Sequence, residues 1–225
     1  MIRAVVFDFD GVIANSEPLH FRAYRDVLRT QGIALTERAY YDRYLGYDDI
    51  GAFRAIAADA SVAVTDEDIS HLVGRKALRM EELERESSVL FPGARSAVER
   101  TAARWPIAIA SGALKAEILR VLDRESLRQY FPIVVSAEDT PASKPDPAPY
   151  LRAVELLRST VPDLRPAECV AIEDSKWGLV SAGHAGLRTV GITHTYPERE
   201  LVDASDVVIG HLDSFTEDLV RRLAR

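Results

Sequence analysis

Two aspartates that follow a short apolar run could carry out chemistry together. Ala4 to Phe7 reads Ala-Val-Val-Phe, which predicts a buried strand of a parallel sheet, and Asp8 and Asp10 come just after it. Alternate residues of an extended chain point to the same side, so both carboxylates can face one pocket, and Gly11 then allows a sharp turn. Two neighbouring carboxylates repel each other unless a cation lies between them. Mg²⁺ is the hard cation that such oxygens bind.

Taken alone, two acids at this spacing are more often solvated residues of a turn. Three later segments weaken that interpretation, because each places polar groups of a particular type at a strand end or just before a helix. The segments are Ser111-Gly112, Ser143-Lys144-Pro145-Asp146-Pro147 and Glu173-Asp174-Ser175.

Each of these segments also has a simpler structural interpretation. Ser111 is suited to capping a helix, although a hydroxyl beside the N–H groups of a helix start also binds anions. Lys144 resembles any solvated lysine, but the prolines around it would hold it in a fixed place. Glu173 and Asp174 suit the start of a helix that Ser175 caps.

The four segments together make a set for phosphoryl transfer. A metal ion can offset the charge between carboxylates and a phosphate. A hydroxyl and a lysine can bind the phosphoryl oxygens, and a carboxylate can act as a covalent nucleophile. The residue types alone leave open which aspartate is the nucleophile and which is the acid.

The composition limits the classes of function. The 225 residues are 47% hydrophobic, enough for a full core, and the net charge of −7 argues against nucleic acid or an anionic membrane as partner. The single cysteine, Cys169, opens a predicted strand and suits a reducing compartment. The sequence shows neither a secretory signal nor an apolar stretch of membrane-spanning length. We therefore expect a cytoplasmic protein, either a monomer or a weak homodimer.

Short apolar runs alternate with amphipathic helical segments from Phe91 onward. The expected strands are Ile107–Ala110, Ile133–Val135, Val170–Ile172, Arg188–Gly191 and Val207–Ile209. The expected helices are 94–104, 114–123, 147–159, 175–185 and 214–224. With the first strand, this alternation predicts an α/β fold with a Rossmann-like parallel sheet and helices on both faces. Trp105 and Trp177 are expected in its core.

Residues 15–87 differ from both flanks, because they read as helices with no clear strand. Helices are expected from Glu17 to Gln31, Thr36 to Leu45, Asp49 to Ala58 and Thr65 to Glu86. We therefore expect a core domain of residues 1–14 and 88–225 and an inserted helical cap of residues 15–87. The cap should lie over the carboxyl ends of the strands, where open α/β sheets bind ligands.

The four segments, in this order, resemble the haloacid dehalogenase (HAD) superfamily of phosphotransferases. The quoted matches are Asp8-Phe9-Asp10-Gly11-Val12, Ser111-Gly112, Lys144-Pro145-Asp146-Pro147 and Glu173-Asp174-Ser175. The helical insertion resembles the subfamily I cap of phosphatases and β-phosphoglucomutases. The resemblance covers the whole chain, and the combination of four motifs is far more specific than any one of them.

The resemblance implies a role for each motif residue. Asp8 would be the nucleophile and a metal ligand. Asp10 would be general acid and then general base, and its backbone carbonyl would bind the metal. The phosphoryl group would be held by Ser111, Gly112 and Lys144, and the Mg²⁺ site would be completed by Glu173 and Asp174.

The resemblance implies a Mg²⁺-dependent phosphoric monoester hydrolase that acts on a small phosphorylated metabolite through an aspartyl-phosphate. The alternative is a phosphosugar mutase of the β-phosphoglucomutase type. A dehalogenase needs no second aspartate, so Asp10 argues against it. A response-regulator receiver is shorter and lacks a helical insertion.

Candidate substrate contacts in the cap are His20, Arg54 and Lys76, although each can also be an exposed helix side chain. The turn Gly46-Tyr47-Asp48-Asp49 is acidic where the mutases carry a basic residue for a second phosphate. This difference favours the hydrolase, although Arg54 could replace the missing cation. The remaining histidines, His194 among them, are expected to be surface or packing residues.

Overall fold

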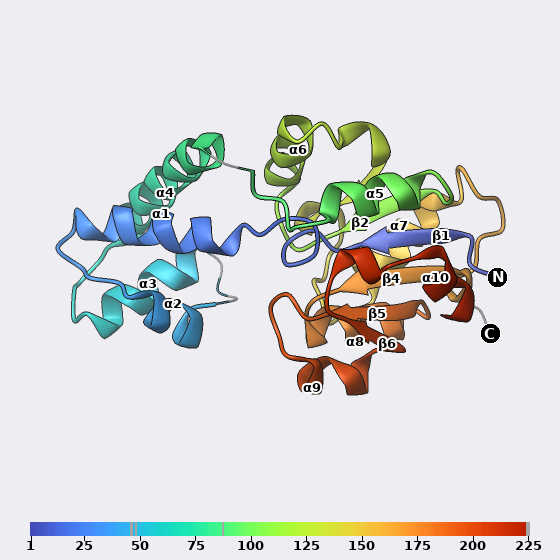
Figure 1. Cartoon of the computed structure of the whole chain (residues 1–225). Helices are drawn as coiled ribbons and strands as arrows, with labels where there is room; N and C mark the ends of the chain where they lie inside the picture. Colours follow the sequence, from blue (N-terminus) through green and yellow to red (C-terminus); the bar gives the residue numbers. More distant parts are fainter. Residues whose placement is uncertain (46, 48, 87, 224–225) are drawn as a thin grey trace. The chain divides into compact units, whose positions relative to one another are not determined.

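A computed structural model describes residues 1–45, 47, 49–86 and 88–223 of the chain (Figure 1). The chain divides into two compact units. The core unit consists of Met1–Asn15 and Val89–Arg225, and the helical unit is Ser16–Ser88. Among the described residues, no helix is both long and apolar enough to cross a bilayer.

A six-stranded parallel sheet forms the centre of the core unit. Its strands are β1 (Ala4–Phe7), β2 (Ile107–Ala110), β3 (Ile133–Val135), β4 (Cys169–Glu173), β5 (Arg188–Ile192) and β6 (Val207–Ile209). They lie in the order β3-β2-β1-β4-β5-β6, so the first strand of the chain is central. Each strand agrees with its sequence-based prediction to within one residue at either end, which confirms the α/β fold class.

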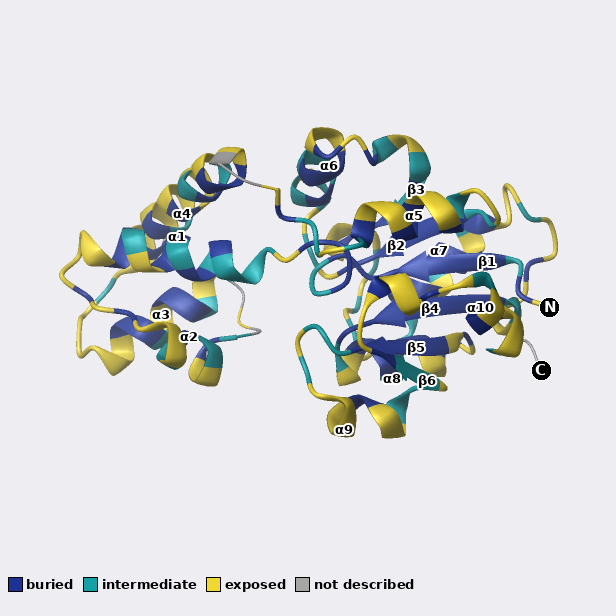
Figure 2. Cartoon of the chain, in the orientation of Figure 1, coloured by how far each residue is buried: buried dark blue, intermediate teal, exposed yellow. Residues whose placement is uncertain are grey.

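Helices cover both faces of this sheet (Figure 1). They are α5 (Ala94–Ala102), α6 (Lys115–Arg124), α7 (Ala148–Leu157), α8 (Lys176–His184), α9 (Glu198–Leu201) and α10 (Glu217–Leu223). On one face, Ala4 and Val6 of β1 share an apolar cluster with residues of α7 and α8. On the other face, the ring of Phe7 packs edge-on against Phe131 and Phe215. Figure 2 shows the strands buried between helices whose outer faces are exposed.

The register of the sheet aligns the ends of the central strands. Phe7 of β1 pairs with Ile109 of β2 on one side and with Ile172 of β4 on the other. The N–H of Asp8 still donates to the Ile172 carbonyl, at 2.9 Å. Since the carboxyl ends of parallel strands meet at one edge of a sheet, the polar residues after these strands are brought together.

The expectation that both tryptophans lie in the core is wrong for Trp177, whose exposed fraction is 61%. It lies in the first turn of α8, where Gly178, Leu179 and Ala182 are buried and helical periodicity turns Trp177 toward solvent. Trp105 is half-buried and lines a shallow groove with Phe215. That groove lies before β2 begins, so it does not belong to the edge where the polar strand ends meet.

The helical unit has a hydrophobic interior of its own. Its helices are α1 (Glu17–Arg29), α2 (Glu37–Arg43), α3 (Asp49–Asp59) and α4 (Asp66–Glu86). Aromatic rings from three of them meet, and Tyr24 lies 5.0 Å from Phe53 and 5.6 Å from Tyr40 between ring centroids. The described residues of this unit contain helices and no strand, as expected. The position of this unit over the sheet stays a prediction.

Candidate active site

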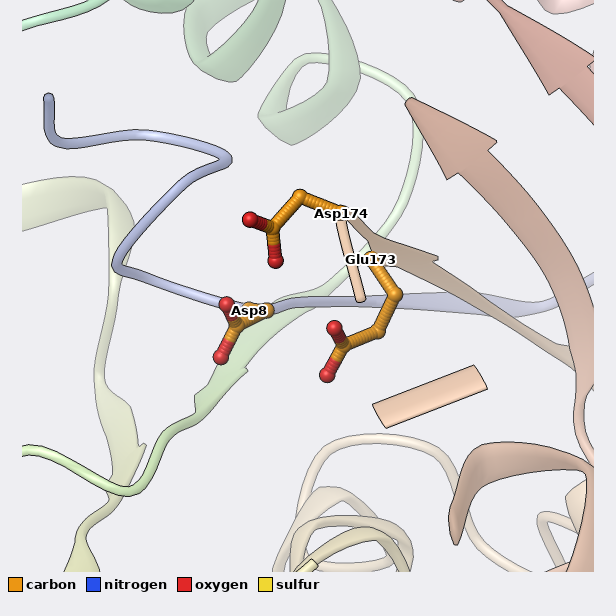
Figure 3. Close-up of side chains that lie close together, drawn as sticks. All are labelled: Asp8, Glu173 and Asp174. Carbon is orange, nitrogen blue, oxygen red and sulfur yellow. The ribbon is translucent and has the colours of Figure 1, made fainter. Parts of the chain in front are cut away.

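Three buried carboxylates from two neighbouring strands face one another at the carboxyl edge of the sheet. Asp8 follows β1, Glu173 ends β4 and Asp174 comes next in the chain. One oxygen from each lies within 4.8 Å of the others, and the residues are 6%, 1% and 6% exposed. Figure 3 shows the three side chains converging on a common space. Oxygen ligands packed this closely suit a hard divalent cation.

Two glycines make room for these carboxylates. A Cβ atom at Gly11 would lie 1.9 Å from Oδ2 of Asp174, and one at Gly178 would lie 1.9 Å from Cδ of Glu173. Gly11 also has φ of +81°, a conformation that side chains other than glycine rarely adopt. The backbone of the loop after β1 and that of the first turn of α8 are therefore in direct contact with the acids.

Lys144 supplies a positive charge to this cluster. Its Nζ donates to Oδ1 of Asp8 at 2.5 Å, to Oε1 of Glu173 at 2.6 Å and to the Ala110 carbonyl at 2.9 Å. Its side chain is only 14% exposed. The interpretation of Lys144 as a solvated lysine is therefore wrong, because three oxygens at the ends of three different strands fix its ammonium group.

The loop that carries Lys144 is anchored to two helices. The N–H of Asp146 donates to the Ser143 carbonyl at 3.0 Å, and the Asp146 carboxylate accepts the N–H of Ala148, the first residue of α7, at 2.8 Å. The buried hydroxyl of Ser181 in α8 donates to the Asp146 carbonyl at 2.6 Å. These bonds hold the loop without any contribution from the lysine side chain.

Tyr150 belongs to the same cluster and was not predicted from the sequence. Its hydroxyl donates to Oε1 of Glu173 at 2.6 Å, and its ring centroid lies 5.2 Å from Nζ of Lys144. It is fully buried in α7. The sequence pattern predicted only a helix over residues 147–159, and a core tyrosine and one that orients a carboxylate look the same in that pattern.

The electrostatics of the cluster favour a bound cation. Burial and the charge of Glu173 raise the pKa of Asp8 well above its usual range, and the same two causes raise the pKa of Asp174 to about 7. Burial disfavours the charge on Lys144, but Asp8 and Glu173 outweigh it and raise the pKa of that lysine. One ammonium group faces three carboxylates, so a divalent ion would remove the remaining repulsion.

Ser111 lies at the end of β2, beside the Ala110 carbonyl that Lys144 contacts. It is 3% exposed, and its Oγ accepts the N–H of Ala113 at 3.0 Å. The interpretation of Ser111 as a helix cap is wrong, because α6 begins at Lys115, whose N–H donates to Glu138 instead. Ser111 and the exposed Gly112 therefore form a turn before the helix rather than its cap.

Ser175 caps α8 as its position suggested, and its Oγ accepts the N–H of Gly178 at 3.1 Å. The same hydroxyl donates to Oε2 of Glu173 at 3.2 Å. The structural and the site interpretations of this segment are therefore compatible, since the cap residue also orients one of the acids.

Asp10 lies half-buried in a loop that folds back on itself. The N–H groups of Ile13 and Ala14 both donate to the Phe9 carbonyl, at 2.8 and 2.9 Å. The returning chain runs beside this loop, since Asn15 donates to the Val89 carbonyl at 2.6 Å. Both connections to the helical unit therefore begin next to the loop that carries Asp10.

The helical unit brings two of its three candidate residues together. Lys76 is 2% exposed, and its Nζ lies 2.6 Å from Oδ1 of Asp49 and 2.8 Å from Nδ1 of His20. The alternative of an exposed lysine is wrong, because packing of α4 against α1 encloses the side chain. Arg54 is exposed and pairs with Asp66 at 2.8 Å. Gly46 and Asp48 lie outside the described residues.

Comparisons with known proteins match the chain to one family and to several relatives. Residues 2–186 match the family described as haloacid dehalogenase-like hydrolase. A phosphorylated carbohydrates phosphatase of Thermotoga maritima is 31% identical over 92% of this chain and 94% of its own. Hexitol phosphatase B of Escherichia coli K12 is 31% identical over 84% of this chain and 82% of its own. The crystal structure of a putative β-phosphoglucomutase from Thermotoga maritima superimposes with a TM-score of 0.78 at 28% identity, covering 92% of this chain and 94% of that one.

Proposed function

Because the chain belongs to the haloacid dehalogenase-like hydrolase family, we propose that it is a Mg²⁺-dependent phosphatase that hydrolyses small phosphate monoesters through an aspartyl-phosphate. One observation carries the proposal: Lys144 bridges Asp8 and Glu173 beside Asp174 in a buried cluster. This edge of the sheet therefore offers a carboxylate for nucleophilic attack, a fixed cation for phosphoryl oxygens and further acids for a metal ion.

In this mechanism Asp8 attacks the phosphorus atom, and the bond to the leaving oxygen breaks. Lys144 and Ser111 bind the phosphoryl oxygens, and Lys144 also keeps the Asp8 carboxylate in place. The residues that would hold Mg²⁺ are Asp8, the Asp10 carbonyl, Glu173 and Asp174. When bound, the ion would neutralise the charge between these carboxylates and the phosphate.

Asp10 transfers a proton in both half-reactions. It donates a proton to the leaving oxygen as the aspartyl-phosphate forms. It then accepts a proton from the water that attacks this intermediate, so that inorganic phosphate leaves and Asp8 and Asp10 return to their starting states. The resemblance of Asp8-Phe9-Asp10-Gly11-Val12 to the first motif of the superfamily supports this role for the second aspartate, two residues after the proposed nucleophile.

The proposed substrates are monophosphates of sugars or sugar alcohols. Relatives named as phosphatases of phosphorylated carbohydrates and hexitols support this class. A mutase must hold a second phosphate, which requires a cation available to it. In the helical unit Lys76 is paired with Asp49, and Arg54 is paired with Asp66. These pairings favour water as the phosphoryl acceptor.

We further propose that the enzyme works in the cytoplasm as a monomer or weak homodimer. Cys169 supports a reducing location, since it is buried and free, and burial raises the pKa of its thiol to about 12. Such a thiol is a packing residue rather than a reactive one.

The first test is turnover of an aryl phosphate with and without Mg²⁺. We expect EDTA to abolish phosphate release and added Mg²⁺ to restore it, whereas activity that survives complete chelation would contradict the proposal. The second test supplies β-glucose 1-phosphate with catalytic glucose 1,6-bisphosphate. Free phosphate should exceed glucose 6-phosphate, and the reverse ratio would identify a mutase.

A further inference from the structure

A histidine outside the four motifs links two segments beside the site. His194 follows β5, and its Nδ1 lies 2.9 Å from the Gly11 carbonyl. Its ring stacks on Phe91, with centroids 3.9 Å apart and planes 15° from parallel. We propose that His194 is a positioning residue that fixes the Asp8–Ala14 loop, and with it Asp10, against the rest of the core unit.

The contacts of the loop explain why it needs such a link. Most of its backbone bonds are internal, including those from Gly11 to the Ala14 carbonyl and from Ile13 to the Phe9 carbonyl. The backbone bonds that leave the loop lie near its two ends, from Asp8 to the Ile172 carbonyl and from Phe91 to the Ile13 carbonyl, so the turn at Gly11 depends on other contacts for its place. The bond from His194 joins the turn of the loop to the chain that follows β5, two strands away from β1.

Phe91 adds a second, indirect connection between His194 and the loop. Its N–H donates to the Ile13 carbonyl at 3.0 Å, so the residue that stacks on His194 is itself bonded to the loop. His194 therefore holds the loop directly through Gly11 and indirectly through Phe91. The imidazole must donate from Nδ1, because a carbonyl oxygen only accepts, which assigns the proton to that nitrogen in the neutral ring.

The position of Gly11 gives this link a catalytic consequence. Gly11 lies against the Asp174 carboxylate and is the next residue after Asp10. A shift of the loop would therefore move the proposed general acid and one side of the acid cluster at once. Misplacement by about 1 Å commonly lowers a rate by up to about 100-fold. The binding of substrate through Lys144 would change less.

Two substitutions separate the hydrogen bond from the ring stack. His194→Phe keeps a ring against Phe91 and removes the donor, whereas His194→Asn keeps an amide donor near the place of Nδ1 and removes the ring. His184→Phe is a matched control, because His184 is exposed at the end of α8. The measurements of kcat and KM rest on the proposed function, so amide hydrogen exchange of the metal-free protein is measured as well.

We expect faster amide exchange at Gly11, Ile13 and Ala14 in His194→Phe, and wild-type exchange there in His184→Phe. We expect kcat of His194→Phe to fall about tenfold with KM within about twofold, and His194→Asn to recover most of kcat. Unchanged loop exchange in His194→Phe would overturn the proposal. Equal losses of kcat in His194→Phe and His194→Asn, each matched by a loss of thermal stability, would also overturn it. A wild type without phosphatase activity would contradict the proposed function alone, and the exchange result would still decide this inference.

Discussion

Gly11 and Asp174 are in contact in a way that leaves no space for a side chain at residue 11. A Cβ atom there would lie 1.9 Å from Oδ2 of Asp174, and φ of Gly11 is +81°. The loop after β1 and the acid after β4 therefore fit together only because residue 11 is glycine. This relationship connects the proposed general acid on one segment to the proposed metal ligand on the other.

Gly11→Ala should consequently reduce both catalysis and metal binding. The added methyl group must displace Asp174 or the loop, and a displacement of about 1 Å predicts a loss in kcat of roughly 100-fold. Gly186→Ala is the control, because Gly186 has φ of +85° but its Cβ would meet only Pro166, at 3.4 Å. The control should lose stability by about 1 kcal/mol and keep its kcat. Similar kcat losses in both variants would show that backbone strain, and not the contact with Asp174, is responsible.

Mg²⁺ should stabilise the protein more at high pH than at low pH. The pKa of Asp174 is raised to about 7 and that of Asp8 is raised as well, so the metal-free folded state holds more protons than the unfolded state. Stability from this source is complete below the unfolded pKa near 4 and is lost as pH rises toward 7. Mg²⁺ binds the deprotonated carboxylates and opposes that loss. Thermal unfolding with and without Mg²⁺ should show a larger rise in Tm near pH 8 than near pH 5, and an equal rise at both would count against the site.

Glu173→Gln should separate metal binding from folding. The amide keeps the shape of the side chain and can still accept from Tyr150 and Lys144, but it removes one of three mutually repelling charges. We expect equal or higher stability without metal and Mg²⁺ affinity lower by about 10- to 100-fold. Glu155→Gln, on the exposed side of α7, is the control for a simple change of surface charge. Titration calorimetry with Mg²⁺ checks the affinity, and unchanged affinity in Glu173→Gln would remove this residue from the metal site.

The helical unit should depend on Asp49 for its stability. Asp49 is the carboxylate beside Lys76, which is 2% exposed, so Asp49→Asn would leave a buried ammonium group without its counter-ion. Because Asp49 is itself 31% exposed, water screens part of the effect, and we expect a loss of about 1–3 kcal/mol. Asp66→Asn removes the partner of the exposed Arg54 and should cost less than about 0.5 kcal/mol. Chemical denaturation measures both, and equal losses would contradict the difference in burial.

The sequence pattern was sufficient to predict the sheet and the meeting of the motif residues at one edge of it. Apolar runs between amphipathic segments predicted the strands, and parallel topology then brought the residues after β1, β2 and β4 to one edge. The charge types of Asp8, Lys144 and Asp174 indicated phosphoryl transfer before any contact was visible. The strands and the meeting of these residues could be predicted because both depend on local periodicity and on a rule that holds for every parallel sheet.

What the pattern could not provide was the identity of long-range partners. Tyr150 bonds Glu173, which is 23 positions away, and Lys76 is buried against Asp49, 27 positions away. Neither sequence separation can be read from a local pattern, because both contacts depend on how elements far apart in the chain pack together. For Trp177 the prediction itself was wrong. A large apolar residue suggested a place in the core, but its position on α8 turns it to solvent.

The most direct test of the account is to trap the phosphoryl group on Asp8. In Asp10→Asn, an aryl phosphate with a good leaving group needs little acid assistance, so the aspartyl-phosphate should form. Its hydrolysis should be slow, because the base that activates water is absent. Mass spectrometry of the acid-quenched and digested protein should then place one phosphoryl group on Asp8, and Asp8→Asn should carry none. A phosphoryl group on another residue, or equal labelling in Asp8→Asn, would contradict the central claim that Asp8 is the nucleophile.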